Sequence, residues 1–188
     1  MRSRIYLLDS NVFIHAARQY YAFDLVPSFW EGLEWHAREG RVRSIDRVRD
    51  ELKRGKDDLW DWARNHFSHG FASADDSDVL QAYGEIAKWA YGQSQFSRAA
   101  RDAFFDGADG WLVAYARAKG CIMVTHETFD KHAKRRIKIP NACKAFGIPY
   151  MNTFGMLRKL GGLGSQASAT FDDDKLTGPR FSEQKVIR

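Results

Sequence analysis

Acidic side chains from separate parts of the 188-residue sequence could form a hydrolytic site. They are Asp9, Glu51, Asp106, Asp109 and Glu127. Two carboxylates about 4 Å apart repel each other by about 4 kcal/mol at an effective dielectric near 20, so converging acids need a cation or must take up protons. Oxygen ligands without a set of cysteines or histidines favour Mg²⁺ or Mn²⁺, and such an ion can assist the attack of water on a phosphodiester.

Each acid also has a simpler interpretation. Asp9 could simply be a helix cap, and Asp106 and Asp109 could simply be acids that stabilise a helix N-terminus through its dipole. Glu51 could pair with an exposed base nearby, and Glu127 could lie on a surface loop. Composition and spacing alone leave both interpretations open.

The predicted secondary structure indicates where these acids lie. Short apolar runs predict strands over residues 5–8, 121–124 and 148–151, and the alternation of residues 41–45 predicts another. Apolar spacing and capping residues predict helices over residues 12–17, 27–39, from 46 onward, 57–69, 79–91, 111–119 and 153–160. We expect Asp46 and Thr153 to cap the helices that follow them, and Asp106 and Asp109 to share one face at the start of the 111–119 helix.

The alternation of strands and helices predicts an α/β fold with a central parallel sheet. In such folds, sites form beyond the carboxyl ends of the strands, where Asp9 and Glu127 fall. We expect residues 1–160 to form one domain. Residues 161–188 are rich in glycine and acids and predict a tail without a core, which is either disordered or bound to a partner.

Composition narrows the class of protein. Apolar residues make up 44% and charged residues 28%, as in a globular domain. No apolar run approaches the ~18 residues of a membrane span, and no signal-peptide core precedes Asp9. The two cysteines, Cys121 and Cys143, cannot build a four-ligand zinc site and are interpreted as buried thiols. We therefore expect a cytoplasmic protein with no membrane contact.

The basic residues are unevenly placed. The net charge is +5, with seven lysines and arginines in residues 41–56 and six in residues 131–144. Two such clusters indicate a polyanionic partner, although a solvated charged face is the usual alternative.

Four short motifs resemble those of PIN (PilT N-terminus) domains, and they occur in the same order. They are YLLDSNVFI at 6–14, VRDEL at 48–52, ADGWLVAYA at 108–116 and VTHETF at 124–129. The resemblance covers roughly residues 4–160. It looks closest to a bacterial and archaeal branch of uncharacterised PIN proteins that carry the Val-Thr-His-Glu string. It implies a three-layer α/β/α fold with a helical insert between the second and third motifs.

The resemblance implies an endoribonuclease that uses Mg²⁺ or Mn²⁺, often the toxin of a toxin–antitoxin pair. By position, Asp9, Glu51 and Asp109 would be the central metal-binding acids. Glu127 would be the fourth acid, where the family more often has aspartate.

Three further residues have supporting roles in this interpretation. Ser10 would orient Asp9 through its hydroxyl, and Asp106 would support the metal ligands from outside. For His126 we favour a structural or substrate-contacting role over that of a general base, because the metal–water mechanism needs no histidine.

The basic clusters would bind RNA phosphates on both sides of the acids. The residues concerned are Lys131, Lys134, Arg135 and Arg136 after the fourth motif, and Arg47, Lys53 and Arg54 around the second. The tryptophans and tyrosine of the insert (Trp60, Trp62, Trp89 and Tyr91) are expected mostly in the core, although a few could stack on bases or form a homodimer surface.

An antitoxin protein would have to mask the cleft, with the tail or the aromatic insert taking part. Two alternatives stay open: a catalytically silent module that binds nucleic acid or a partner, and a nuclease that acts on DNA.

Overall fold

A parallel sheet forms the centre of the computed structural model, which describes residues 4–162. Within that range the sheet has five strands in the order β3-β2-β1-β4-β5. Their bounds are β1 (Tyr6–Leu8), β2 (Val42–Ile45), β3 (Phe71–Ala72), β4 (Ile122–Val124) and β5 (Tyr150–Met151). All neighbouring strands pair in parallel. The predicted α/β class with a central parallel sheet is therefore confirmed.

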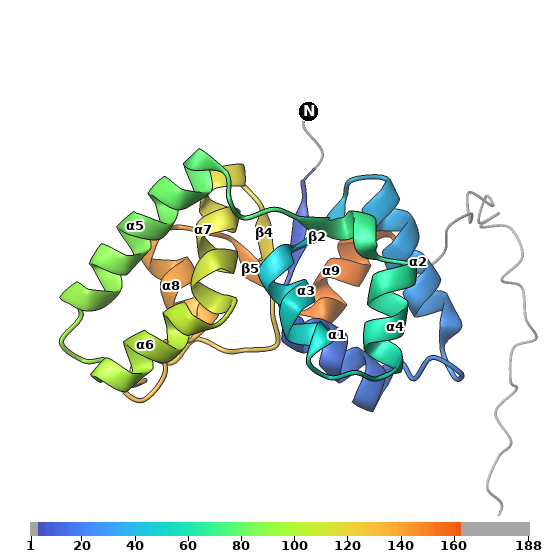
Figure 1. Cartoon of the computed structure of the whole chain (residues 1–188), viewed down its shortest axis with the longest axis horizontal. Coiled ribbons are helices and arrows are strands. Elements are labelled where there is room, and N and C mark those ends of the chain that lie inside the picture. Colours follow the sequence, from blue (N-terminus) through green and yellow to red (C-terminus); the bar gives the residue numbers. More distant parts are fainter. Residues whose placement is uncertain (1–3, 163–188) are drawn as a thin grey trace, which may run out of the picture.

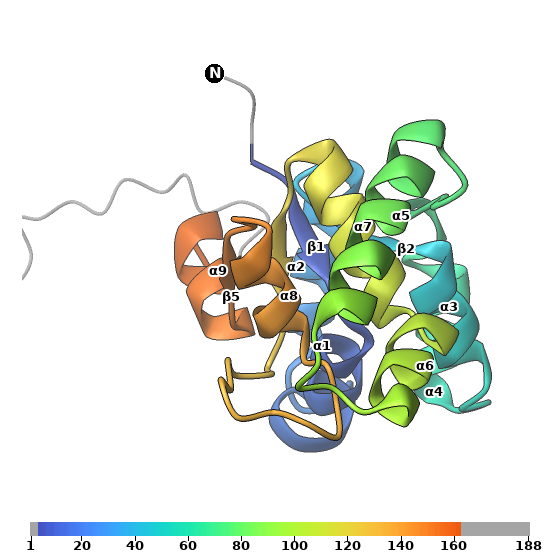
Figure 2. The ribbon, with the colours of Figure 1, turned by 90° about the vertical axis from the view of Figure 1, so that its left-hand side faces the viewer.

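Helices cover both faces of the sheet. They are α1 (Ser10–His15), the π-helical η1 (Ala16–Tyr20), α2 (Pro27–Arg38), α3 (Asp46–Lys53), α4 (Asp58–Asn65), the 3-10 turn η2 (Ser68–Gly70), α5 (Ser77–Gly92), α6 (Arg98–Asp106), α7 (Asp109–Lys119), α8 (Ile139–Ala145) and α9 (Thr153–Leu160). Helices α5 to α8 lie on one side of the sheet, and α1, α2, α4 and α9 lie on the other (Figure 1). Figure 2 looks onto the first side, with α5 and α7 in front of β1 and α2 behind it. This arrangement is the predicted three-layer architecture.

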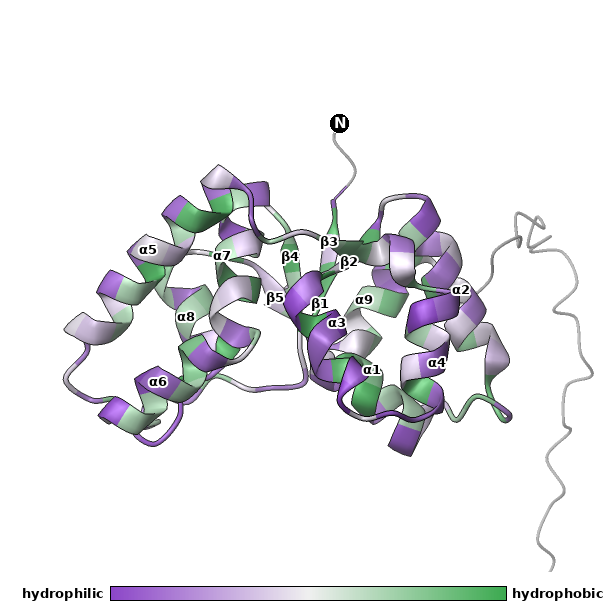
Figure 3. Ribbon diagram, in the orientation of Figure 1, coloured by the Kyte–Doolittle hydropathy of each residue, from purple (hydrophilic) through white to green (hydrophobic). Residues whose placement is uncertain are grey.

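Strands β1 and β4 are apolar because helices cover them on both faces. Leu7, Leu8, Met123 and Val124 are wholly buried. Figure 3 shows the hydrophobic colour on the central strands, while hydrophilic residues colour much of the helices around them. The core thus holds β1 and β4 side by side and aligns the ends of both strands.

Several helices and strands differ from those that the sequence predicts. The predicted 57–69 helix ends at Asn65, and β3 follows η2 within the expected helical insert. Gly70 permits this turn, because a Cβ at that position would lie 2.6 Å from the Phe67 ring. Helices α6 and α8 were not predicted, and β5 starts only after Pro149, which has no N–H to give to a ladder.

The expectation that Asp106 and Asp109 share a helical face is wrong. Helix α6 ends at Asp106, Gly107 is extended, and α7 begins at Asp109. The break at Gly107 puts the two acids on different helices, and Asp106 is exposed.

The assignment of the cap of α9 to Thr153 is also wrong. The side chain of Asn152 accepts the hydrogen bond from Gly155 N at 2.9 Å. The hydroxyl of Thr153 instead meets the ring of His126.

Other expectations concern parts of the chain away from the site. Cys121 and Cys143 are free and buried, as expected. Between residues 4 and 162, no helix combines the length and the apolar character that a membrane crossing requires. Nearly all of the expected 161–188 tail lies outside the described residues, which end at 162.

Candidate active site

The chain order places a switch point between β1 and β4. From β1 the chain builds β2 and β3 on one side, and then crosses back to build β4 and β5 on the other. In open parallel sheets, ligands bind beyond the carboxyl ends of the strands at such a point. Those ends face α1, at the bottom of Figure 1.

Asp9 lies at this switch point, directly after β1. Its backbone N–H donates to Val124 O at 3.1 Å, which aligns it with the end of β4. Its side chain is wholly buried and accepts hydrogen bonds from Thr125 Oγ1 (2.9 Å), Ser10 Oγ (3.3 Å) and Asn11 Nδ2 (3.3 Å). The expected hydrogen bond from Ser10 is therefore present. The carboxylate makes no capping hydrogen bond to α1, so helix capping does not explain it.

The electrostatics of Asp9 favour a nearby positive charge. Burial raises the pKa of its carboxyl, the hydrogen bond from Thr125 opposes this, and the negative charge of Glu127 raises the pKa further. A buried carboxylate in this position is stabilised either by a proton or by a cation.

Asp109 is the first residue of α7, and its carboxyl interacts with the charges of Asp9 and Glu127. Its side chain is 20% exposed. Burial raises its pKa to about 7, with further increases from the charges of Asp9 and Glu127 and a smaller one from Glu51. Arg136 lowers it and lies 3.5 Å away, Nη2 to Oδ2.

Glu51, on α3, reaches the start of α7. Its Oε1 accepts a hydrogen bond from Ala108 N at 2.9 Å. No lysine or arginine of residues 4–162 forms an ion pair with it, so the expected alternative of a nearby base is not what holds it. Its carboxylate instead satisfies an N–H at the positive end of a helix.

Glu127 follows β4 and is tied in the same manner. Its Oε2 accepts from Ile139 N at 2.8 Å, at the start of α8. Its Oε1 lies 2.8 Å from Nη2 of Arg136, and its own N–H donates to Thr125 Oγ1 at 3.1 Å. The side chain is only 12% exposed, so Glu127 is not a freely solvated loop acid.

The structure thus brings four of the five candidate acids together. Asp9, Glu51 and Glu127 all act on the pKa of Asp109. Asp106 is the exception, because it is exposed at the end of α6. The sequence analysis predicted no role for Thr125. Its position was the available signal, because Thr125 directly follows β4 as Asp9 directly follows β1.

The donor set suits a hard cation in type, since it consists of carboxylate oxygens. Within the described chain, however, no three acidic, histidine or cysteine side chains are arranged closely enough to hold a metal ion as they stand. The Arg136 guanidinium lies between Asp109 and Glu127 and bridges them. A positive charge therefore already compensates two of the four acids.

The basic residues differ in how free they are. Lys131, Lys134 and Arg135 are exposed. A cavity of about 370 Å³ lies along the segment before α8 and is lined by Asp130, His132, Ala133, Lys134, Arg135, Arg136 and Lys138. Lys53 and Arg54 are exposed at the end of α3.

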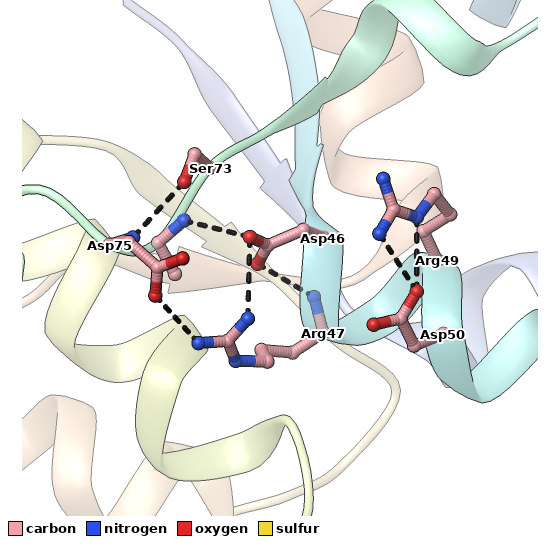
Figure 4. A network of polar contacts seen from close by, with 7 residues as sticks. Asp46, Arg47, Arg49, Asp50, Ser73 and Asp75 are labelled. Atoms are coloured by element: carbon pink, nitrogen blue, oxygen red, sulfur yellow. Dashed lines mark hydrogen bonds and ion pairs between the residues drawn. The ribbon is translucent and has the colours of Figure 1, made fainter.

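Arg47 is held in a polar network (Figure 4). Its guanidinium pairs with Asp75 at 2.7 Å and Asp46 at 3.4 Å, and it lies 4.9 Å from the centre of the Trp111 ring. Asp46 also accepts from Ala74 N at 3.3 Å. These contacts join α3 to the segment after β3 and engage the guanidinium of Arg47 within the fold.

His126 precedes Glu127 in the sequence, but its ring contacts Thr153 and His15 rather than the candidate acids. Its Nε2 is 2.9 Å from Thr153 Oγ1, and its ring stacks on His15 at 5.3 Å. Burial lowers its pKa, and the charge of His15 lowers it further. These contacts fit the structural or substrate-contacting role that we favoured for it.

The aromatic residues of the insert are mostly packed. Trp62 is buried, and Trp60 and Trp89 pack against the core with partial exposure. Tyr91 is 54% exposed on α5. Of these four residues, only Trp62 belongs to the buried core, while Trp60 and Trp89 pack against its edge.

Comparisons with known proteins identify a family. The chain resembles the crystal structure of VapBC2 from Rickettsia felis bound to a DNA fragment from its promoter, with a TM-score of 0.48 and 16% identity over 79% of this chain and 98% of that one. No curated protein matches the chain. The model of the family described as a domain of unknown function, DUF4411, matches residues 6–162. Because this match spans most of the sequence, the chain belongs to the DUF4411 family.

Proposed function

We propose that this protein is a metal-dependent endoribonuclease that hydrolyses RNA phosphodiester bonds. The observation that carries the proposal is the convergence of Asp9, Glu51, Asp109 and Glu127 at the switch point of the sheet, where burial, together with the charges of the other three acids, raises the pKa of Asp109 to about 7. The order of the four PIN-like motifs supports the same activity, and we propose that residues 4–160 form a PIN-type domain.

We propose that Asp9 and Asp109 hold Mg²⁺ or Mn²⁺ and that Glu51 and Glu127 complete the site. When bound, such an ion lowers the pKa of a water molecule and neutralises charge on the phosphate. Asp9 suits this role because three hydrogen bonds fix its oxygens. Glu51 and Glu127 are held against the starts of α7 and α8, which keeps their negative charge close to the pair.

Arg136 has a second role in this proposal. Its guanidinium bridges Asp109 and Glu127, and a phosphate can compete for the same donors, because guanidinium pairs with phosphate as well as with carboxylate. Lys131, Lys134 and Arg135 extend the basic surface along which the RNA backbone would lie. In the reaction, water loses a proton as its oxygen bonds to phosphorus, and the leaving ribose oxygen takes up a proton as its bond to phosphorus breaks.

Cleavage of a fluorescent single-stranded RNA, with a matched DNA strand alongside, tests the activity. We expect Mg²⁺- or Mn²⁺-dependent cleavage of the RNA by the wild-type chain. Asp9→Asn and Asp109→Asn should each lower the rate by about 100-fold or more, since each removes a charge from the site. Asp106→Asn is the matched control and should cleave like the wild type, because Asp106 is exposed and separate.

Wild-type rates in both Asp9→Asn and Asp109→Asn would overturn the proposal. Faster cleavage of the DNA strand would assign the activity to DNA instead.

We further propose, from the motif resemblance, that the chain is the toxin of a toxin–antitoxin pair and that a partner protein covers the acids. Induced expression tests this with the same variants. The wild-type chain should arrest growth, and Asp109→Asn should not. Equal arrest by both would contradict a toxic nuclease.

A second candidate function is a module that binds nucleic acid without turnover. Arg136 favours it, because an arginine already compensates two of the acids, and both glutamates already have backbone partners. RNA binding without cleavage, at every divalent ion tried, would favour this candidate over the nuclease.

A further inference from the structure

Exposed aromatic side chains gather beside the candidate site. Seven large hydrophobic side chains of residues 4–162 are exposed. Four of them are aromatic and lie near Glu127. Phe129 and Tyr150 line one pocket there, and Tyr20 and Phe154 contact His126, which also lines it. The pocket has a volume of about 280 Å³ and is lined by residues 125–129 and 150–152. Exposed aromatic rings gathered in one place mark a binding surface.

The rings form an ordered group around His126. Tyr20 lies nearly parallel to His126, with 6.1 Å between ring centres. Phe154 meets both edge-on, at 5.8 Å from Tyr20 and 6.4 Å from His126. Behind them, His15 stacks on His126, and Thr153 holds its Nε2. The rings come from α1, η1, the segment after β4 and α9, so tertiary packing sets their positions.

The exposure of these rings leaves aromatic surface for a ligand. Tyr20 is 48% exposed and Phe154 is 37% exposed. Aromatic faces bind unpaired nucleobases by stacking, and they do so with little dependence on sequence. In a duplex the bases stack on one another, so this recognition requires a single strand.

The surrounding charges favour a nucleic acid over a protein as the ligand. Nζ of Lys144 lies 4.2 Å from the centre of the Phe129 ring, and the exposed Lys131 follows two residues later. Arg136 contacts the carboxylate of Glu127, the residue that follows His126 in the sequence. Aromatic rings bordered by lysine and arginine match the bases and phosphates of one strand.

We propose that Tyr20 and Phe154, packed against His126, form a stacking platform for unpaired bases of single-stranded RNA next to the bond that is cut. The proposal rests on the proposed function for its position, because His126 is joined directly to Glu127 and Thr125 bonds to Asp9. A base on this platform places its phosphate near the four acids. The platform therefore selects single-stranded over paired RNA.

Anisotropy of a labelled, unstructured 12-nucleotide RNA, bound to the full chain in EDTA, measures the platform without cleavage. Tyr20→Ala and Phe154→Ala should each weaken binding roughly 5- to 100-fold, the range for loss of one base stack. Tyr20→Phe keeps the ring and should bind like the wild type. Tyr91→Ala, which removes a similarly exposed tyrosine on α5, is the matched control and should have no effect.

A second RNA, of the same length but with abasic positions, separates stacking from charge. It should bind the wild type as weakly as the intact RNA binds Tyr20→Ala. The Tyr20→Ala variant should bind this abasic RNA only slightly more weakly than the wild type does. A duplex of the same sequence should show no dependence on Tyr20.

The outcomes separate the two proposals. If Asp9→Asn abolishes cleavage while Tyr20→Ala and Phe154→Ala bind and cleave like the wild type, the platform is wrong and the nuclease stands. If the wild type binds RNA through Tyr20 but never cleaves, the platform stands and the nuclease is wrong. If the variants leave RNA affinity unchanged and instead reduce self-association in sedimentation, the surface binds protein and the platform is overturned.

Discussion

Asp109 shows, at the scale of a single residue, how the carboxylates of the site act on one another. Its pKa rises to about 7 because the side chain is largely buried and three other acids add negative charge, while Arg136 only partly compensates. In the unfolded chain the group has an ordinary pKa, near 3.8. The folded state therefore holds this proton more tightly than the unfolded state between these two values.

This difference predicts the pH dependence of stability. In that window the folded chain binds more protons, so the free energy of unfolding falls as pH rises from about 4 to about 7 and then levels off. In EDTA, the melting temperature of the wild type should fall relative to that of Asp109→Asn between pH 5 and pH 8. Some slope should remain in the variant, because the pKa of Asp9 is also raised.

Thermal melts by circular dichroism measure the effect, with Asp106→Asn as the control that should follow the wild type. Parallel curves for Asp109→Asn and the wild type would show that Asp109 ionises freely in the folded chain.

At the scale of elements, two helices begin on glutamates from other parts of the chain. Glu51 accepts from Ala108 N before α7, and Glu127 accepts from Ile139 N at the start of α8. The first N–H groups of a helix have no partner within it, and a carboxylate there is favoured by both the hydrogen bond and the helix dipole. These contacts fix α7 and α8 against the site. At position 127, the glutamate side chain makes this contact while it also meets Arg136.

The contact of Glu51 predicts a split between two substitutions. Glu51→Ala leaves Ala108 N–H without this partner and should lower the free energy of unfolding by about 1 kcal/mol. For a chain of this size that corresponds to a melting temperature about 2–4 °C lower. Glu51→Gln keeps an acceptor and removes one of the charges that act on Asp109, so it should melt at or above the wild type.

Glu31→Ala, at an exposed position of α2, controls for the loss of a surface glutamate. Equal melting temperatures for Glu51→Ala and Glu31→Ala would show that the contact with α7 contributes nothing to stability.

At the scale of the whole molecule, the sheet order decides where the site lies. The chain places β1 beside β4 and brings α3 and α7 to the same carboxyl edge. The four acids therefore join segments from residue 9 to residue 127. A ligand that contacts all of them binds only the folded chain and must stabilise it.

Mn²⁺ should therefore raise the melting temperature. At a concentration of about 100 times the dissociation constant, the gain is about 2.7 kcal/mol, or roughly 5–10 °C. Asp9→Asn and Asp109→Asn should lose most of this gain, while Asp106→Asn should keep it. Scanning fluorimetry with Mn²⁺ and reversal by EDTA measures it, and an identical gain in all four proteins would mean that the ion binds elsewhere.

Local sequence patterns account for much of the secondary structure. The apolar runs at 5–8 and 121–124 became β1 and β4, because burial on both faces requires continuous apolar residues, and the alternating residues 41–45 became β2. Most long helices were also predicted, since apolar spacing and capping are read within one or two turns. The motif order further placed acids at the ends of β1 and β4. Strand β3 was not predicted because it has only two residues, and α8 has only seven. Helix α6 has nine residues, and its local signal, the cap of Ser97, was not used.

The partners of the polar side chains depend instead on how distant segments pack together. Thr125 bonds to Asp9 across 116 positions, and Glu51 bonds to Ala108 across 57. The same is true of Arg136, which bridges Asp109 and Glu127, and of Arg47, which is bound to Asp46 and Asp75. Local sequence determines whether a segment becomes a helix or a strand, since that choice depends on neighbouring residues. A hydrogen bond or ion pair needs a distance near 3 Å between two particular atoms, and only the packing of the layers sets that distance.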